Sequence, residues 1–181
     1  YTKSNPEYSG KVTVPVLWDT EDQVIINNES ADIIEMLNDD WSFVAKHPDL
    51  DLMPEYLRKE REDLNVWVYE HINNAVYRTG FASNQVVYEK ECRALFVALD
   101  QLEHQLSSQS YLFGDKICDT DVRLFTTLIR FDAVYVGHFK CNLKMIREYS
   151  NLHAYMLRIY KRVKDTVDIH SIKAHYYQSH P

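Results

Sequence analysis

The scarcity of helix-breaking residues restricts most of this chain to long helices. Its 181 residues include only four Gly and five Pro, and after Pro54 the apolar residues recur at intervals of three and four, which is the period of an amphipathic helix. Leu64, Val68, Ile72 and Val76 form one such row. We therefore expect a series of helices, which cover residues 54–79, 84–107, 119–136, 142–149, 151–164 and 168–177.

The opening residues have a different pattern. Lys11–Asp19 and Gln23–Asn28 are rich in β-branched residues and flank a polar turn, which predicts a hairpin, and a helix with Ser30 as its N-cap is expected from residue 31 to about residue 38. One hairpin and one helix do not make an independently stable sheet. Val12–Leu17 is also apolar on both faces. We therefore expect the covering elements to lie upstream, so that the chain begins inside a domain.

Composition excludes several classes of function. Twenty basic against 27 acidic residues give a net charge of −7, which argues against a nucleic-acid partner because phosphate binding needs a basic surface. The sequence has no apolar run long enough to span a membrane. The four Gly form neither of the Gly-rich nucleotide-binding motifs. Three separated cysteines favour a reducing, cytoplasmic setting over a disulfide scaffold.

Two short motifs in the opening segment are candidates for ligand binding. A cis Val14-Pro15 bond would turn the backbone N–H and C=O of Val14 outward toward an extended peptide; the simpler alternative is a trans proline in an edge strand. Glu29-Ser30 opens a helix, whose free N–H groups and dipole attract a carboxylate, while Glu29 could take an ammonium group. By itself, this second motif is more simply explained as helix capping.

The remaining candidates are tyrosines and cysteines. The chain has thirteen Tyr, and a phenol can donate a proton or a hydrogen bond to an oxygen-bearing ring. Ordinary packing is the simpler interpretation of any single tyrosine. The three cysteines lack a CxxC motif and the eight His form no zinc pattern, so we expect structural cysteines and no metal. The tyrosines near predicted helix ends, where a side chain can face a cleft, are Tyr77, Tyr135, Tyr176 and Tyr177.

Longer strings of residues resemble a known family. The run VPVLWD followed by NNES resembles the end of the thioredoxin-like half of a glutathione transferase. The strings Asn73–Ala82, Asp121–Asp132 and Val134–Asn142, and the closing His175-Tyr176-Tyr177, resemble the glutathionyl-hydroquinone reductases, also called Xi-class glutathione transferases. The resemblance covers nearly the whole chain. It implies an α+β to mainly α fold, in which an incomplete thioredoxin-like half precedes an all-helical domain.

The resemblance also implies a division into domains, an activity and partners. Residues 1–40 would be the end of the glutathione-binding domain, 41–53 a linker and 54–181 the helical domain. The family uses glutathione as co-substrate to reduce glutathionyl-hydroquinones to hydroquinones by thiol exchange, which needs a reactive thiolate. Members are cytoplasmic and usually form homodimers through the helical domain. The family's nucleophile lies in a Cys-Pro-Trp-Ala-type motif that this chain lacks, so we expect the chain by itself to be inactive and the motif to lie upstream.

The resemblance also implies which residues of this chain form the site, because their positions match the family's motifs. The resemblance places Val14, with Pro15 cis, against the cysteinyl part of glutathione, and Glu29 and Ser30 against its γ-glutamyl end. Lys11, Val12 and Thr13 are expected on the same strand. Tyr77 matches the proton donor or acceptor to the hydroquinone. Tyr135, and one of Tyr176 and Tyr177, match tyrosines whose hydroxyls stabilise the catalytic thiolate.

Two other interpretations of the function stay open. A binding or scaffold protein could keep the transferase fold without the chemistry, and the missing cysteine favours that reading. A conventional glutathione transferase would instead conjugate electrophiles, and the tyrosine-bearing strings argue against it.

Overall fold

The chain is mainly helical, with one small sheet, as expected. The computed structural model describes residues 1–179, so the last two residues of the predicted helical domain lie outside it. The structure divides into two compact units, Tyr1–Met53 and Pro54–Pro181. Each unit has its own internal organisation.

The first unit contains the predicted hairpin. Strand β1 (Leu17–Asp19) pairs antiparallel with β2 (Val24–Asn27), and Asp19 lies opposite Val24. The side chain of Asp19 holds the turn, because its Oδ1 accepts hydrogen bonds from the backbone N–H groups of Glu21 at 2.7 Å and Asp22 at 2.9 Å. Asp at the start of a turn stabilises it in this way.

The predicted first strand is too long. Residues 11–16 are not in a strand, and Val12 and Val14 are 70% and 90% exposed. A strand needs a neighbour to satisfy its backbone groups, and β2 pairs only with Leu17–Asp19. The backbone of Thr13 uses a side chain instead: the hydroxyl of Tyr1 donates to its carbonyl at 2.8 Å and accepts from its N–H at 3.2 Å.

Helix α1 (Ser30–Asp39) begins one residue earlier than predicted. Ser30 is its first helical residue, and Glu29 occupies the N-cap position without a side-chain capping bond. The prediction of Ser30 as the cap is therefore wrong. Asn27 organises the approach to the helix, since its Oδ1 accepts the Glu29 N–H at 2.7 Å and its side-chain amide donates to Asp32 at 3.1 Å. A single 3₁₀ turn, Ser42–Val44, follows.

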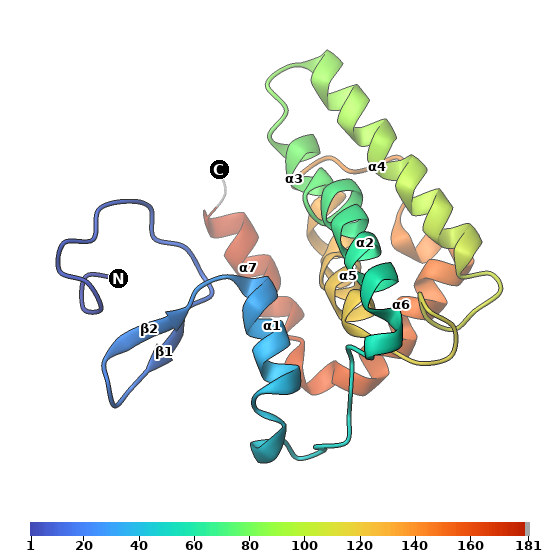
Figure 1. Cartoon of the computed structure of the whole chain (residues 1–181). Helices are drawn as coiled ribbons and strands as arrows, with labels where there is room; N and C mark the ends of the chain where they lie inside the picture. Colours follow the sequence, from blue (N-terminus) through green and yellow to red (C-terminus); the bar gives the residue numbers. More distant parts are fainter. Residues whose placement is uncertain (180–181) are drawn as a thin grey trace. The chain divides into compact units, whose positions relative to one another are not determined.

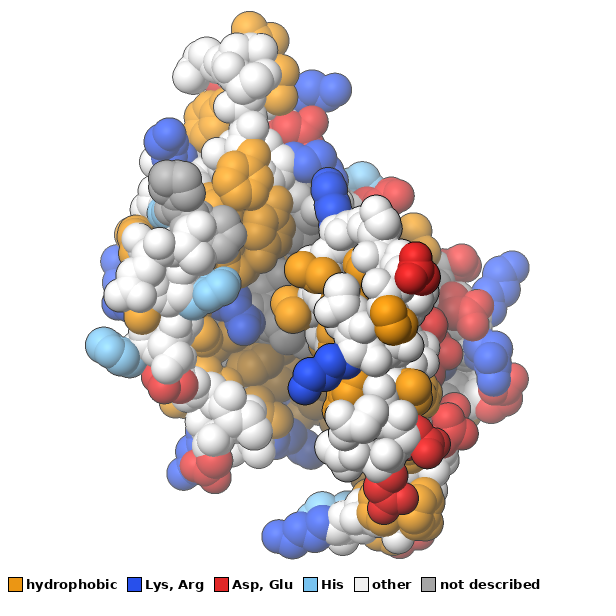
Figure 2. Space-filling model, turned by 90° about the vertical axis from the view of Figure 1, so that its left-hand side faces the viewer, with side chains coloured by type: hydrophobic (Ala, Val, Ile, Leu, Met, Phe, Trp, Pro, Cys, Tyr) orange, Lys and Arg blue, Asp and Glu red, His pale blue; other side chains and the backbone are white. Residues whose placement is uncertain are grey.

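No described residue of the first unit is buried. Exposed apolar side chains occur in both units: Val14 and Phe43 in the first are 90% and 80% exposed, and Val86 in the second is 79% exposed. Figure 2 shows such hydrophobic side chains at the surface, interspersed with acidic and basic ones. The buried core belongs to the second unit alone.

The second unit is a bundle of helices, shown in Figure 1 in green to red. Its elements are α2 (Arg58–Val68), α3 (Ala75–Gly80), α4 (Gln85–Gln105), α5 (Asp119–Arg130), α6 (Ser150–Val163) and α7 (Ile169–Ser179), with 3₁₀ turns at Glu55–Leu57, Ile146–Glu148 and Lys164–Thr166. The helix predicted over 142–149 is thus only one 3₁₀ turn.

Helix α5 lies inside the bundle. It packs against α2 and α6, and α4 packs against α3 and α6; α5 lies behind α2 in Figure 1. Helix α4 and the residue after it present one apolar row to the core, because Leu95, Leu99, Leu102 and Leu106 are all buried. Asn84 caps α4, since its side chain accepts the Val87 N–H at 3.0 Å.

Two π turns interrupt the helices predicted over 54–79 and 119–136. Tyr69–Asn73 separates α2 from α3, and Phe131–Tyr135 follows α5 directly. In the first of these π turns, the side-chain amide of Asn73 donates two hydrogen bonds to α5. One goes to the Arg123 carbonyl at 3.0 Å and the other to the Thr127 hydroxyl at 2.6 Å. Gly80 is the last residue of α3 and has no positive φ, so this helix does not end on a left-handed glycine.

A buried carboxylate starts α5. Asp121 accepts hydrogen bonds from the backbone N–H groups of Leu112 at 2.9 Å and Cys118 at 2.8 Å, and from the hydroxyl of Tyr155 at 2.8 Å. Cys118 is the N-cap residue, and Asp121 reaches back to its N–H as in a capping box. Burial raises the pKa of the Asp121 carboxyl.

We expect Asp121→Ala to lower the free energy of unfolding by about 3 kcal/mol, because it leaves its buried donors without their acceptor. Asp115 is exposed on the same connecting segment, so Asp115→Ala should change stability by less than about 0.5 kcal/mol. Urea unfolding of both variants measures the difference. Equal losses would contradict the role of Asp121.

Candidate functional site

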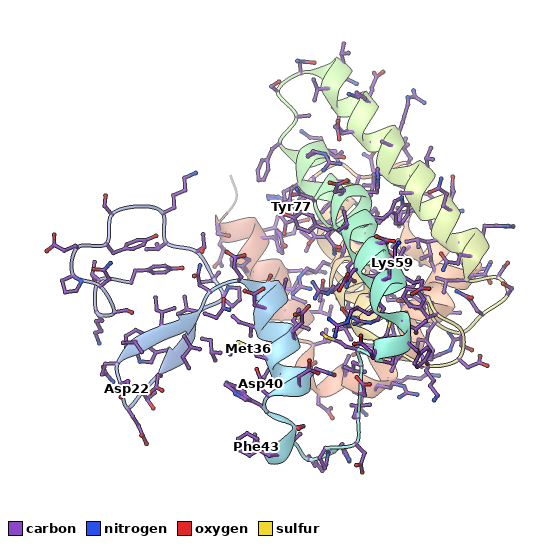
Figure 3. All side chains as sticks on the ribbon, in the orientation of Figure 1. Asp22, Met36, Asp40, Phe43, Lys59 and Tyr77 are labelled. Carbon is purple, nitrogen blue, oxygen red and sulfur yellow. The ribbon has the colours of Figure 1, made fainter. Side chains whose placement is uncertain are left out.

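Three tyrosine hydroxyls meet inside the helical unit. The hydroxyl oxygen of Tyr176 lies 2.7 Å from that of Tyr77 and 2.9 Å from that of Tyr135. The three residues come from α7, α3 and the π turn after α5, and any two of them are 41 or more positions apart in the sequence. Tyr77 is labelled in Figure 3. We call Tyr77, Tyr135 and Tyr176 the tyrosine triad.

Both π turns adjoin the triad. Tyr135 is the last residue of the turn Phe131–Tyr135, which closes with the Val136 N–H donating to the Phe131 carbonyl at 3.0 Å. Tyr77 lies four residues after the turn Tyr69–Asn73. A π turn inserts one residue into a helix and so changes which side chains face inward, and such turns are frequent at functional sites.

Burial keeps Tyr77 and Tyr135 neutral. Tyr135 and Tyr176 are buried and Tyr77 is half-buried. Desolvation, with the hydrogen bond to Tyr176 next, raises the pKa of Tyr77 to about 12. Desolvation raises the pKa of Tyr135 further, and the hydrogen bond to Tyr176 adds to the effect. Near neutral pH these phenols therefore keep their protons.

A neutral chain of three hydroxyls can donate one hydrogen bond to a ligand. It has three protons and two internal links, so one proton remains for an outside acceptor. Tyr77 is the one member of these three hydrogen-bonded tyrosines that is only half-buried. The arrangement suits proton delivery to a group that gains negative charge, provided that the group comes within hydrogen-bond reach.

The structure places the adjacent residues Tyr176 and Tyr177 in different environments. Tyr177 is 54% exposed, and its ring packs on His138 with centroids 5.0 Å apart. It makes no hydrogen bond to the triad. Of the two tyrosines that the sequence left undecided, Tyr176 thus belongs to the cluster and Tyr177 does not.

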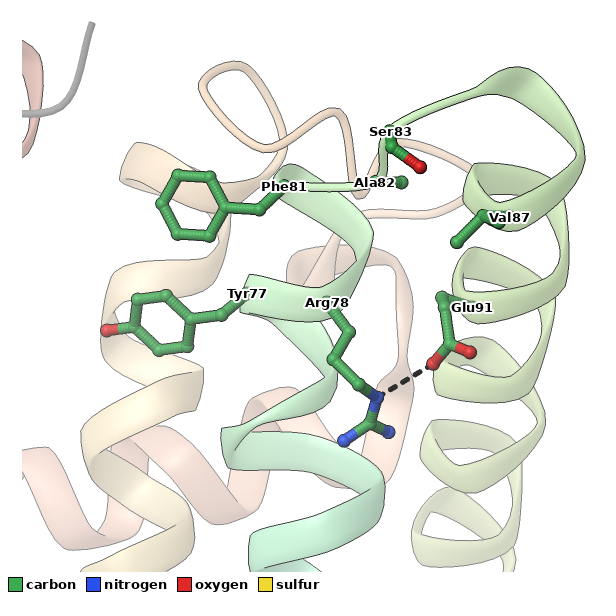
Figure 4. A pocket seen from close by; sticks show the side chains of 7 residues that line it. All are labelled: Tyr77, Arg78, Phe81, Ala82, Ser83, Val87 and Glu91. Carbon is green, nitrogen blue, oxygen red and sulfur yellow. Dashed lines mark hydrogen bonds and ion pairs between the residues drawn. The ribbon is translucent and has the colours of Figure 1, made fainter.

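A surface pocket of about 410 Å³ lies beside Tyr77, between α3 and the start of α4. In Figure 4 the rings of Tyr77 and Phe81 project together to one side of α3, while Arg78 projects toward α4. There Arg78 pairs with Glu91 at 2.8 Å, and it also donates to the Glu70 carbonyl at 2.7 Å. The hydroxyl of Tyr77 points to the side of α3 away from α4 (Figure 4).

The candidate ligand-binding backbone lies in the first unit. The Val14–Pro15 bond is cis, which confirms that expectation. Among residues 1–179, no hydrogen bond to the Val14 backbone is found. Lys11, Val12 and Thr13 precede it in an irregular segment instead of the expected strand, and the Lys11 carbonyl accepts from the hydroxyl of Tyr8.

Glu29 and Ser30 are exposed at the start of α1. Within the described part of the chain, the Glu29 carboxylate has no hydrogen-bond or ion-pair partner. The side-chain amide of Asn28 donates to the Thr13 hydroxyl at 3.3 Å. This bond joins the residue before Glu29 to the residue before Val14, so the two candidate motifs lie side by side.

The cysteines are poor nucleophiles. Cys92, Cys118 and Cys141 are free and buried. Burial raises the pKa of Cys118 and of Cys141 to about 12 in each case, so little thiolate forms near neutral pH. Within residues 1–179 no group of three or more His, Cys, Asp or Glu is placed to hold a metal ion. None of the helices in that part of the chain is long and apolar enough to cross a membrane.

Comparisons with known proteins show which families the chain resembles. Residues 3–40 match the model of the glutathione S-transferase N-terminal domain, and residues 85–158 match that of the C-terminal domain. The chain is 46% identical to glutathionyl-hydroquinone reductase PcpF of Sphingobium chlorophenolicum, over 100% of this chain and 58% of that protein.

Solved structures show the same similarity. The glutathione-bound structure of YqjG, a glutathione transferase homologue from Escherichia coli K-12, superposes with a TM-score of 0.95 at 42% identity, over 99% of this chain and 59% of that one. Glutathione transferase Xi 1 from Trametes versicolor has a TM-score of 0.94 at 44% identity, over 100% and 64% of the two chains. The chain thus spans less than two thirds of the length of these relatives.

The position of Tyr176 between two hydroxyls gives a stability prediction. Tyr176→Phe removes both hydrogen bonds of the triad in a buried site, and should lower the free energy of unfolding by about 2 kcal/mol. Tyr177→Phe removes a hydroxyl of the adjacent, exposed residue, and should change it by less than about 0.5 kcal/mol. Chemical denaturation measures both, and an inverted order would reject the assignment of Tyr176 to the triad.

Proposed function

The chain belongs to the glutathione transferase family, with Xi-class members among its relatives, and from this premise we propose that it takes part in the glutathione-dependent reduction of glutathionyl-hydroquinones. The main supporting observation is the tyrosine triad, a neutral, partly buried donor in a helical unit. A thiol exchange that releases a hydroquinone needs such a donor for the departing ring.

The proposed reaction balances as follows. A cysteine thiolate attacks the sulfur of the glutathionyl substituent, so that an S–S bond forms and the sulfur–ring bond breaks. The ring takes the electron pair of the broken bond and a proton, which Tyr77 delivers. A second glutathione then attacks the mixed disulfide, which frees the cysteine and gives oxidised glutathione. Residues 1–181 do not contain the Cys-Pro-Trp-type thiol that this scheme uses.

Tyr135 and Tyr176 have a supporting role in the proposal. Hydroxyls that donate to a sulfur anion favour the thiolate and lower its pKa. Because the triad shares its protons through Tyr176, a proton that leaves Tyr77 can be replaced from within the chain of hydroxyls. Tyr177, which lies outside the triad, has no part in this scheme.

The first unit is proposed to bind glutathione. The unpaired backbone of Val14 would pair with the cysteinyl part of the tripeptide, with Pro15 fixing the turn and Lys11, Val12 and Thr13 alongside. The start of α1 at Ser30 offers free N–H groups to a carboxylate. The exposed carboxylate of Glu29 would accept the ammonium group of the γ-glutamyl end.

Two further proposals rest on family resemblance. The protein would form a homodimer through its helical domain, where Val86 and Val97 of α4 expose apolar surface. It would act in the cytoplasm, a reducing compartment in keeping with three free cysteines.

We expect Glu29→Ala to weaken glutathione binding by about tenfold to a hundredfold, because it removes one charged hydrogen bond. Calorimetric titration with glutathione measures the change. Glu21→Ala makes the same replacement at an exposed position in the hairpin turn and should leave the affinity unchanged. A Glu29→Ala variant that binds as well as the Glu21→Ala control would remove Glu29 from the site.

We expect Tyr77→Phe to slow hydroquinone release by about a hundredfold, the usual effect of losing a general acid, with glutathione affinity unchanged. The assay uses a protein that contains these residues together with the Cys-Pro-Trp-type motif, and follows hydroquinone by chromatography. Undiminished turnover would exclude Tyr77 from the proton transfer. Conjugation of electrophiles without any release of hydroquinone would instead indicate a conventional transferase.

A further inference from the structure

One phenylalanine touches every ring of the tyrosine triad. The ring centroid of Phe139 lies 5.2 Å from that of Tyr77, 5.4 Å from that of Tyr135 and 6.0 Å from that of Tyr176. The ring stacks on Tyr135 with an interplanar angle of 4°, and meets Tyr176 edge to face at 82°. Both are favourable aromatic geometries. Phe139 is only 2% exposed, so it acts on the tyrosines and not on a ligand.

A fixed turn holds Phe139 in this place. It follows the π turn Phe131–Tyr135, and the chain folds back at Lys140, which has a positive φ of 58°. The N–H of Cys141 then donates to the carbonyl of Tyr135 at 3.0 Å, and the hydroxyl of Tyr88 on α4 donates to the carbonyl of Lys140 at 2.7 Å. The turn that presents Phe139 is therefore tied to the backbone of Tyr135 itself.

Gly80 provides the space for this ring. A Cβ atom at Gly80 would lie 2.4 Å from Cδ1, 2.5 Å from Cγ and 2.8 Å from Cβ of Phe139. These are distances that side chains do not adopt, and two of the three atoms are near the backbone end of the side chain and cannot swing away. Gly80 lies three residues after Tyr77, on the same side of α3. The absence of a side chain there lets Phe139 pack beneath Tyr77.

We infer that Phe139 and Gly80 are positioning residues that set the spacing and orientation of the tyrosine triad. Neither has a group that could react. Phe139 fixes the three rings at once, and Gly80 allows α3 to approach it. The structural part of this inference is independent of the proposed function; its catalytic consequence rests on that function.

The structural part is tested by ¹⁹F NMR of the chain labelled with 3-fluorotyrosine, with the triad resonances assigned from single Tyr→Phe variants. Phe139→Leu should shift or broaden the resonances of Tyr77, Tyr135 and Tyr176. Phe96→Leu is the matched control, since Phe96 is a buried ring that packs on Phe131 and, among the described residues, forms no ring pair with a member of the triad. It should leave those three resonances in place.

Gly80→Ala should move the same three resonances, because Phe139 has to shift. Gly137→Ala is its control: the nearest atom to a Cβ at Gly137 is the hydroxyl of the exposed Tyr177, at 3.1 Å. Phe139→Met fills the site with a flexible apolar side chain that adapts to irregular space, and serves if the other variants do not fold. A folded Phe139→Leu or Phe139→Met variant with unmoved triad resonances would overturn the inference.

The catalytic consequence is tested by kinetics of the protein that contains the thiol motif. Phe139→Leu should lower kcat for hydroquinone release by about tenfold to a hundredfold, as expected for misplaced catalytic groups, while glutathione affinity stays within about twofold. A moved triad with unchanged kcat would overturn the positioning role in catalysis. If the unmodified protein releases no hydroquinone, the proposed function fails, and the NMR result still decides the structural part.

Discussion

The helical unit depends on one buried carboxylate. Asp121 is 0% exposed, and it links the segment before α5, the first turn of α5 and the middle of α6 through Leu112, Cys118 and Tyr155. Burying a carboxylate is unfavourable unless its oxygens are fully engaged, and here two backbone N–H groups, a hydroxyl and a thiol engage them. This sets where the central helix starts. Tyr135 of the triad lies in the π turn that follows the other end of this helix.

Much of this fold could be predicted from sequence because it is determined by local patterns. The helix predicted over 84–107 and the hairpin turn after Asp19 both depend on residues close together in the chain. The predicted elements that differ from the structure do so for one reason, which is that contacts distant in sequence decide them. A regular helical period does not reveal a π turn such as Tyr69–Asn73, whose extra residue is stabilised by Asn73 bonding to a different helix. Likewise, β-branched residues at 11–16 favour a strand, but no strand forms without a neighbour to pair with.

The triad was predictable only in part, because its hydrogen bonds join residues far apart in sequence. Resemblance to a family pointed to Tyr77 and Tyr135, and left Tyr176 and Tyr177 undecided. Neighbouring residues on a helix face different directions, and which of them points inward depends on how α7 packs on the turn after α5. The sequence gives no signal for the contact of Phe139 with the triad. A lone phenylalanine in a turn resembles ordinary core packing, and a contact with three rings exists only in the folded molecule.

The difference in burial between the two units has a consequence for how the molecule opens. Residues 1–53 have no buried side chain, whereas the helical unit has fully covered residues such as Leu99, Leu124 and Leu152. Backbone amides in the first unit are therefore protected only by local hydrogen bonds, while those in the interior helices exchange with solvent only when the whole bundle comes apart. Amide exchange of this chain would thus divide into a fast and a slow class, with the boundary near Pro54. The increase in heat capacity on unfolding would come almost entirely from the helical unit, because that unit has the buried apolar surface to expose.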